Sequence, residues 1–179
     1  MTQLKYFSQD VNKILGKYKI RIIHIWLSRV FWGILLYRIE RSLFLIFQKS
    51  YSFLRIPFIP IINLIQSYSN LDIHYKANIK GGILVLHPSV GVVISAKSII
   101  GNNLTLTGGN VIGTKDVVKD MKFEIGNNCY LGANATIIGP LKLGNNIKIG
   151  ANACVVKSYE IDNISLVGVP AKQTNHNKD

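Results

Sequence analysis

An aliphatic residue returns at every sixth position through the second half of this chain, and this spacing constrains the fold most strongly. The longest series is Ile125, Leu131, Ile137, Leu143, Ile149, Val155, Ile161 and Val167. The same spacing occurs upstream in Ile94, Ile100, Leu106 and Ile112, and in Ile73, Ile79 and Val85. A period of six fits neither the period of an α-helix nor that of a strand. The sequence therefore predicts stacked six-residue repeats.

Each repeat is long enough for one short strand and one turn. Gly often follows the aliphatic residue, and Asn often stands two or three places after it. Both residues tolerate the left-handed backbone conformation that tight corners require. If the aliphatic side chains point inward and each repeat stacks on the next, three repeats make a triangular coil of about 18 residues. We therefore predict an all-β parallel β-helix over residues 71–172.

Two interruptions break the period. Val85 and Ile94 are nine positions apart, and this stretch contains His87. Ile112 and Ile125 are thirteen positions apart, and the residues between them, 113–124, are mixed in charge. Extra residues in a solenoid must loop outward, and such loops often carry function.

The residues before the repeats have a different character. Residues 1–66 hold ten basic and two acidic side chains, against eleven and seven in the remainder. Residues 11–48 predict one or two helices, with Ile22, Ile23, Trp26, Val30, Phe31, Ile34 and Leu35 at roughly helical spacing. We expect residues 1–70 to form a basic helical region that covers the open end of the β-helix. The same region is also suited to contact with an anionic membrane.

The sequence also argues against a membrane-spanning protein and against a nucleic-acid-binding protein. Basic side chains and two prolines interrupt every apolar run near the length of a membrane span, and no nucleic-acid motif occurs. We expect a protein that binds no nucleic acid. Cys129 and Cys154 fall within the repeats, where they suit small core positions in a reducing, cytoplasmic environment. Residues 173–179 predict a polar tail.

Four histidines are candidates for chemistry. His176 lies in the polar tail and His24 in the basic helical region, which leaves His74 and His87 in the first coil. Asp72 precedes His87 by fifteen residues, so one circuit of the coil brings the two near each other. A carboxylate beside an imidazole fixes its tautomer and stabilises the imidazolium that forms when it takes a proton. This pair predicts a general base acting on a hydroxyl.

The first coils resemble those of serine acetyltransferases and the related polysaccharide O-acetyltransferases. The resemblance rests on Asp72-Ile73-His74, Ile79-Lys80-Gly81-Gly82, His87 and Gly91-Val92-Val93-Ile94. Ile100-Gly101-Asn102-Asn103 and the segment from Val167 to Lys172 are similar to the later coils and terminus of that family. The resemblance covers residues 71–172 and implies a left-handed parallel β-helix built from hexapeptide repeats.

The resemblance also implies a reaction and a set of site residues. The acceptor hydroxyl gives its proton to His87, which Asp72 orients, and attacks acetyl-CoA directly without an acyl-enzyme. Acetyl-CoA is the co-substrate, no cofactor is permanently bound, and the family's site lies between two subunits of a homotrimer. The matching positions for CoA are the turns Gly132-Ala133 and Gly150-Ala151, with Lys157 and Lys172 for its phosphates.

Some positions depart from the family pattern. Leu86 stands where serine acetyltransferases have an aspartate that helps to hold serine, and Lys122 falls nearest to their second active-site histidine. His74 suits structure or substrate positioning, and the histidine set of a zinc site is incomplete, so no metal is expected. Because Leu86 leaves an ammonium group without a partner, we expect a sugar hydroxyl of a surface or capsular saccharide as the acceptor. A divergent serine acetyltransferase and a non-catalytic trimeric scaffold are the alternatives.

Overall fold

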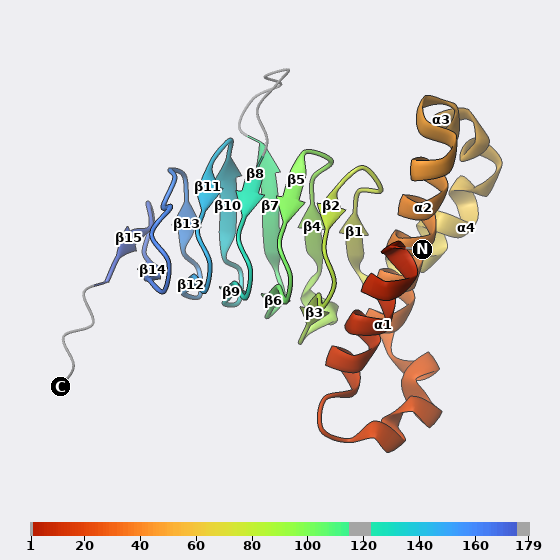
Figure 1. Cartoon of the computed structure of the whole chain (residues 1–179), viewed down its shortest axis with the longest axis horizontal. Helices are drawn as coiled ribbons and strands as arrows, with labels where there is room; N and C mark the ends of the chain where they lie inside the picture. Colours follow the sequence, from red (N-terminus) through yellow and green to blue (C-terminus); the bar gives the residue numbers. More distant parts are fainter. Residues whose placement is uncertain (1, 115–122, 175–179) are drawn as a thin grey trace.

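The computed structural model describes residues 2–114 and 123–174. A three-sided column of strands forms the C-terminal part, and a group of helices lies against one end of it (Figure 1). The fold is the predicted left-handed parallel β-helix preceded by helices.

Three parallel sheets make the sides of the column. Sheet A contains β1 (Leu71–Ile73), β4 (Val92–Ile94), β7 (Asn110–Thr114), β10 (Thr136–Gly139) and β13 (Cys154–Val155). Sheet B contains β2 (Asn78–Ile79), β5 (Ser98–Ile100), β8 (Phe123–Ile125) and β11 (Lys142–Leu143). Sheet C contains β3 (Leu84–Val85), β6 (Thr105–Leu106), β9 (Tyr130–Leu131), β12 (Lys148–Ile149), β14 (Ser165–Val167) and the antiparallel β15 (Lys172–Gln173).

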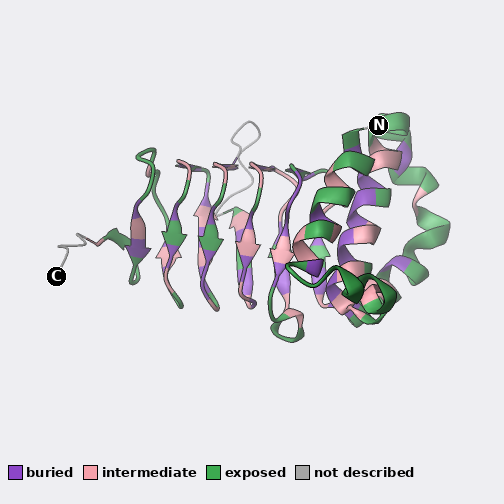
Figure 2. Ribbon diagram, turned by 60° about the horizontal axis from the view of Figure 1, so that its bottom comes forward, coloured by how far each residue is buried: buried purple, intermediate pink, exposed green. Residues whose placement is uncertain are grey.

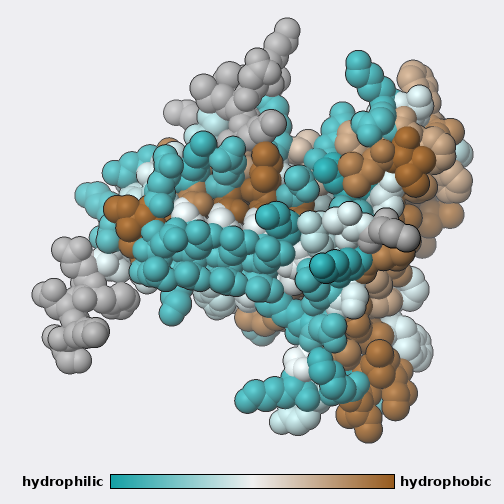
Figure 3. Space-filling model, viewed as in Figure 1, coloured by the Kyte–Doolittle hydropathy of each residue, from teal (hydrophilic) through white to brown (hydrophobic). Residues whose placement is uncertain are grey.

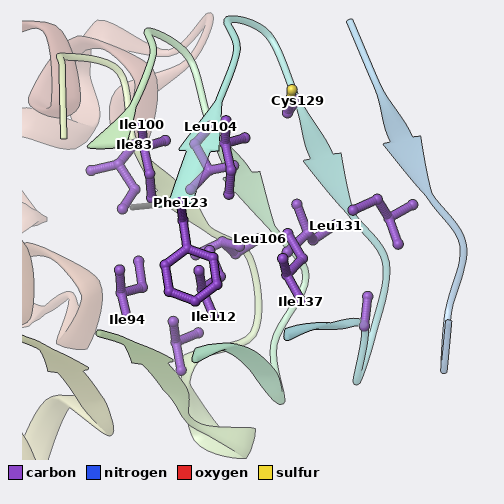
Figure 4. Close-up of a cluster of buried hydrophobic side chains, with 14 of the residues drawn as sticks. Ile83, Ile94, Ile100, Leu104, Leu106, Ile112, Phe123, Cys129, Leu131 and Ile137 are labelled. Carbon is purple, nitrogen blue, oxygen red and sulfur yellow. The ribbon is translucent and has the colours of Figure 1, made fainter. Parts of the chain in front are cut away.

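The periodic aliphatic residues form the core, as predicted. In sheet A, Ile94 pairs in register with Ile73 on one side and with Ile112 on the other, eighteen residues further along. Figure 4 shows such side chains stacked inside the column. Phe123, which we assigned to the second interruption, is fully buried among them, and the free thiol of Cys129 is also buried. The interior is therefore a continuous apolar stack that fixes the position of every outward side chain.

The predicted period fails at the last coil. Ile161 is 66% exposed and Val167 is 44% exposed, whereas Leu166 is fully buried and pairs with Ile149. Only seventeen residues separate Leu166 from Ile149, so this coil is shorter than its predecessors. A single missing residue reverses which side chains point inward, because side chains alternate along a strand. Gln173 and Thr174, assigned to the tail, still bond to this coil.

Asparagine and glycine serve the corners in different ways. Six asparagines of the column adopt the left-handed conformation as predicted: Asn103, Asn128, Asn134, Asn146, Asn152 and Asn163. The glycines that follow Ile125 and Leu131 instead provide space. A Cβ on Gly126 would lie 2.3 Å from the Gly144 carbonyl oxygen, and one on Gly132 would lie 2.6 Å from the Ala151 nitrogen. The coils can stack at these corners because no side chain intervenes.

The helical cap, defined as residues 2–69, covers the first coil. It contains α1 (Thr2–Leu15), η1 (Lys19–Leu27), α2 (Arg29–Phe47), η2 (Gln48–Ser50), α3 (Tyr51–Leu54), η3 (Ile56–Phe58) and α4 (Ile59–Ser69). Residues 11–48, which we predicted to form one or two helices, contain the end of α1, then η1 and α2. Ile22, Ile23 and Trp26 lie exposed in η1, whereas Val30 and Ile34 of α2 are buried. No described helix is both long and apolar enough to cross a membrane.

Buried polar groups attach the cap to the first coil. Arg38 of α2 donates hydrogen bonds to the carbonyl oxygens of Ile79 (2.7 Å) and Lys80 (2.8 Å), and it pairs with Asp10 of α1 at 2.8 Å. The Asp10 carboxylate also accepts the N–H groups of Gly82 (2.7 Å) and Ile83 (2.9 Å). The cap thus satisfies backbone groups that no further coil is present to bond. Figure 2 shows buried residues on the sides of the helices that meet the column.

Candidate active site

His87 lies at a corner of the first coil, between β3 of sheet C and β4 of sheet A. Its backbone N–H donates to the Thr107 carbonyl oxygen at 2.8 Å, which holds it to the coil below. The following residues form the short helix η4 (Pro88–Val90), which accounts for the first interruption of the period. The imidazole is exposed and makes no hydrogen bond within the described part of the chain. Both ring nitrogens are therefore available to a substrate.

The corner beneath His87 is built from a small-residue turn. Gly108 has φ +139, and a Cβ there would lie 2.4 Å from the His87 carbonyl oxygen. The side chain of Asn110 is fully buried, accepts the Gly108 N–H at 2.9 Å and donates to the Gly132 carbonyl at 2.7 Å. Sequence reasoning missed these two residues. Both residues lie one coil after the His87 corner, and Gly108 is twenty-one residues after His87. This spacing could have identified them.

Asp72 lies in a shallow groove on the outer face of sheet A. The groove is lined by Gln66, Ser67, Asn70, Asp72, Ser89, Val90, Gly91, Val92, Val93, Gly109, Asn110 and Val111. Asp72 is the one ionisable side chain among these described residues. Its carboxylate is exposed and accepts the Gln66 side-chain N–H at 3.4 Å. The groove therefore combines a lining of mixed polar and apolar residues with a single negative charge.

The structure brings Asp72 and the loop after His87 to the same groove, but it does not pair the two side chains. Asp72 stands opposite Val93 in register, six residues beyond His87, because the first coil is lengthened by η4. No hydrogen bond or ion pair joins Asp72 to His87 among the interactions of the described residues. Ser89 and Val90, directly after His87, line the groove, whereas His87 itself stands beside it.

The predicted CoA turns lie along the same edge of the column as His87. Gly132-Ala133 connects β9 to β10 and Gly150-Ala151 connects β12 to β13, so each follows a strand of sheet C and precedes one of sheet A. Within sheet C, β9 is two strands from β3 and β12 is three. At about 4.8 Å per strand, these turns lie roughly 10 and 14 Å along the edge from His87.

The backbone groups of these turns differ in availability. The N–H groups of Gly132 and Gly150 donate to Ile149 and Leu166 within the column, at 2.8 Å each. The N–H groups of Ala133 and Ala151 donate no hydrogen bond within the described part of the chain. Within these predicted turns, the alanine amides are therefore the donors free for a ligand, whereas the glycine amides are engaged in the column.

The remaining predicted site residues are dispersed. Lys157 is exposed, with Nζ 5.3 Å from the centre of the Tyr159 ring, and Lys172 is exposed on β15. Leu86 is 44% exposed beside His87. Lys122 lies outside the described residues, as does most of the second interruption. Among the described residues, no group of three His, Cys, Asp or Glu side chains is arranged to hold a metal ion.

His74 has a structural role in the first coil. Its Nδ1 accepts the Lys76 backbone N–H at 3.0 Å, and its ring stacks on Tyr75 with centroids 4.5 Å apart. Burial, helped by the charges of Lys76 and Arg55, lowers the pKa of His74 below 6.5 and keeps Nδ1 free to accept. A role of His74 in substrate positioning stays a prediction.

Comparisons with known proteins agree with this fold. Residues 124–157 match the family model "Bacterial transferase hexapeptide (six repeats)". These coils are hexapeptide repeats of the bacterial transferase type. The chain is 40% identical over 73 residues to serine acetyltransferase 5 of Arabidopsis thaliana, which is 40% of this chain and 23% of that protein. It therefore spans less than a quarter of this curated relative.

Solved structures resemble the chain over nearly its whole length. The crystal structure of the Neisseria gonorrhoeae serine acetyltransferase has a TM-score of 0.80 at 25% identity, covering 99% of this chain and 68% of that one. A serine acetyltransferase in complex with CoA has a TM-score of 0.74 at 24% identity, covering 96% and 70%. The similarity extends through the helical cap, so the cap and the column are combined as in these structures.

Proposed function

We propose that this protein is an acetyl-CoA-dependent O-acetyltransferase with His87 as the general base. The observation that carries the proposal is the single edge shared by His87 and the turns with Ala133 and Ala151. A long, narrow donor such as acetyl-CoA can lie along this edge with its thioester next to the imidazole. The similarity to serine acetyltransferases, including one in complex with CoA, supports this assignment.

The proposed reaction needs one base and no acyl-enzyme. His87 takes the proton of the acceptor hydroxyl while the oxygen attacks the thioester carbonyl carbon. The carbon–sulfur bond then breaks, and the imidazolium returns its proton to the leaving CoA sulfur. Asp72 would accept the other imidazole N–H once the ring turns toward the groove, which stabilises the imidazolium.

The same proposal includes the residues that contact acetyl-CoA and the assembly of the protein into a homotrimer. Ala133 and Ala151 would donate their amide N–H groups to the pantetheine arm, and Lys157 and Lys172 would contact the phosphates. The groove beside Asp72 is open on its outer side. A neighbouring subunit of a homotrimer would close it and exclude water from the reacting atoms.

Two classes of acceptor follow from different observations. The named relatives favour serine, which makes a serine O-acetyltransferase the first activity to test. A saccharide hydroxyl is the second candidate, and Leu86 supports it. This exposed apolar side chain beside His87 offers no partner for the ammonium group of an amino acid, whereas it can pack against the apolar face of a sugar ring.

The proposal is tested by measuring thiol release from acetyl-CoA with serine and with a panel of purified saccharides. We expect release with one acceptor class, a large loss in His87→Ala and a smaller loss in Asp72→Asn. His24→Ala is the matched control, because His24 is also exposed but lies in the cap, and it should retain full activity. Release no faster than the acceptor-free rate with every acceptor, or an active His87→Ala variant, would overturn the proposal.

A further inference from the structure

The exposed charges of the helical cap all have one sign. Its two acidic residues are buried in ion pairs, Asp10 with Arg38 and Glu40 with Arg55. The exposed charged residues of the cap are therefore basic: Lys5, Lys17, Lys19, Arg21 and Lys49. The internal pairing leaves a surface that attracts anions and repels a second copy of itself.

The same surface exposes apolar side chains that do not pack in the hydrophobic core. The segment η1 has no buried residue, yet six of its nine residues are apolar. Ile22, Ile23 and Trp26 are each more than half exposed, and Lys19 and Arg21 alternate with the isoleucines. Interleaved basic and apolar residues with an aromatic side chain are typical of segments that lie in a membrane interface.

A second exposed apolar area lies over α3, η3 and α4. Phe53, Phe58, Ile61 and Leu64 are exposed there, each by more than half. An adjoining groove is lined by Leu36, Ile39, Glu40, Leu43, Phe47, Tyr51, Leu54, Phe58, Ile61 and Ile62. Its one charged side chain, Glu40, is engaged by Arg55 and by the Tyr51 hydroxyl at 3.2 Å. The groove is therefore apolar, and its one carboxylate is already occupied by partners within the cap.

Both areas lie on the side of the cap that is turned away from the column. Figure 3 shows hydrophobic residues along this outer side, at the upper end over α3 and α4 and at the lower end around η1. An exposed apolar surface of this extent is rare on a protein that remains dissolved alone, and it marks a contact with a partner or a membrane.

We propose that the outer side of the helical cap binds an anionic lipid surface, with η1 inserted at the headgroup level and the column projecting away from it. The basic residues would contact the lipid phosphates, and the apolar residues would enter the boundary of the acyl chains. A purely polyanionic partner would leave the apolar residues unexplained, and self-association would bring like charges together. This proposal is independent of the acetyltransferase activity.

Tryptophan fluorescence can report on the insertion of η1 into a membrane. Both tryptophans of the chain, Trp26 and Trp32, lie in the cap. In a Trp32→Phe variant of the full chain, Trp26 alone reports on η1. On vesicles of phosphatidylcholine with phosphatidylglycerol, we expect sedimentation with the vesicles, a blue-shifted emission and quenching by brominated lipid chains. Vesicles of phosphatidylcholine alone should bind more weakly.

Matched variants separate charge from apolar insertion. Lys19→Gln/Arg21→Gln should weaken vesicle binding by roughly 25-fold, because each basic residue at an anionic surface contributes about a fivefold factor. The control Lys142→Gln/Lys148→Gln alters two exposed lysines of the column and should leave vesicle binding unchanged. Ile22→Ser/Ile23→Ser should also weaken binding, whereas Ile161→Ser/Val156→Ser on the column should not. Since η1 has no buried residue, its variants should keep the parent's melting temperature.

Several outcomes would overturn the proposal. One is the absence of binding to anionic vesicles. Another is binding that high salt abolishes and that leaves the Trp26 emission unchanged, since this indicates adsorption by charge alone. A third is concentration-dependent self-association that Ile22→Ser/Ile23→Ser removes while vesicle binding is absent, since the surface would then be an interface between copies.

Discussion

The Asn70 side-chain amide donates a hydrogen bond of 3.1 Å to the Ser89 carbonyl oxygen. Asn70 stands two residues before Asp72, and Ser89 stands two residues after His87. The Asn70 carbonyl oxygen also accepts the Val92 N–H at 2.9 Å. One side chain at the end of α4 therefore links the strand that carries the candidate carboxylate to the loop that carries the candidate base.

This link predicts the effect of Asn70→Gly. Asn70 has φ +53, so glycine keeps the backbone conformation and removes only the amide. We expect kcat for acetyl transfer to fall between tenfold and about 100-fold, because a small displacement of a catalytic group has this cost. Asn163→Gly, another left-handed asparagine at the far end of the column, is the control. Equal kcat values for the two variants would show that the link has no role in positioning.

Gly108→Ala should disturb the His87 loop from below. The added methyl group would meet the His87 carbonyl oxygen and the Val90 side chain, and φ +139 is unfavourable for alanine. We expect a loss of roughly 1–3 kcal/mol in the free energy of unfolding together with lower kcat. Gly113→Ala is the matched control, since its Cβ would meet no atom closer than 3.7 Å. Stability is measured by urea unfolding, and a neutral Gly108→Ala would contradict the packing argument.

Much of the fold could be predicted from the six-residue period alone. Inward positions such as Ile94 and Ile112 follow directly from spacing, because a coil that stacks in register must repeat its buried side chain. The error at Ile161 and Val167 has a local cause. Leu166, seventeen residues after Ile149, takes the buried position predicted for Val167, and Tyr159, sixteen residues after Leu143, pairs with Leu143 in place of Ile161.

Candidate site residues could be proposed from the sequence, but their geometry could not. Spacing identified His87 and Asp72, yet the three extra residues of the first coil set Asp72 opposite Val93. Which amide of each turn is free depends on the next coil, so the sequence could indicate the turns Gly132-Ala133 and Gly150-Ala151 but not which of their N–H groups is available. The hydrogen bonds from Arg38 to the first coil could not be predicted from the sequence either, because the acceptors are backbone carbonyl groups that are distant in sequence.

The buried ion pair of the cap should be important for stability. Asp10→Ala leaves Arg38 charged, buried and without its carboxylate, and we expect a loss of about 3–5 kcal/mol in the free energy of unfolding. Glu124→Ala, which breaks the exposed pair with Lys142, should cost about 1 kcal/mol or less. Adding Arg38→Met to Asp10→Ala should recover part of the loss, because the two residues are coupled. A loss from Asp10→Ala no larger than that from Glu124→Ala would contradict this role of the pair.

The stability of the first coil should depend on pH through His74. Burial, with contributions from Lys76 and Arg55, lowers the pKa of His74 below its ordinary value of 6.5. Just below pH 6.5 the unfolded chain therefore binds a proton that the folded chain does not, and stability falls as the pH decreases through this window. Above pH 6.5 this contribution is fully present. His74→Asn keeps an acceptor for the Lys76 N–H but cannot titrate. The difference in unfolding free energy between the parent and this variant, measured from pH 7.5 to 5 (a range of roughly 1–1.5 units around the His pKa), should change in favour of the variant as the pH decreases. A difference independent of pH would mean that His74 titrates alike in both states and that its burial has no effect on its charge.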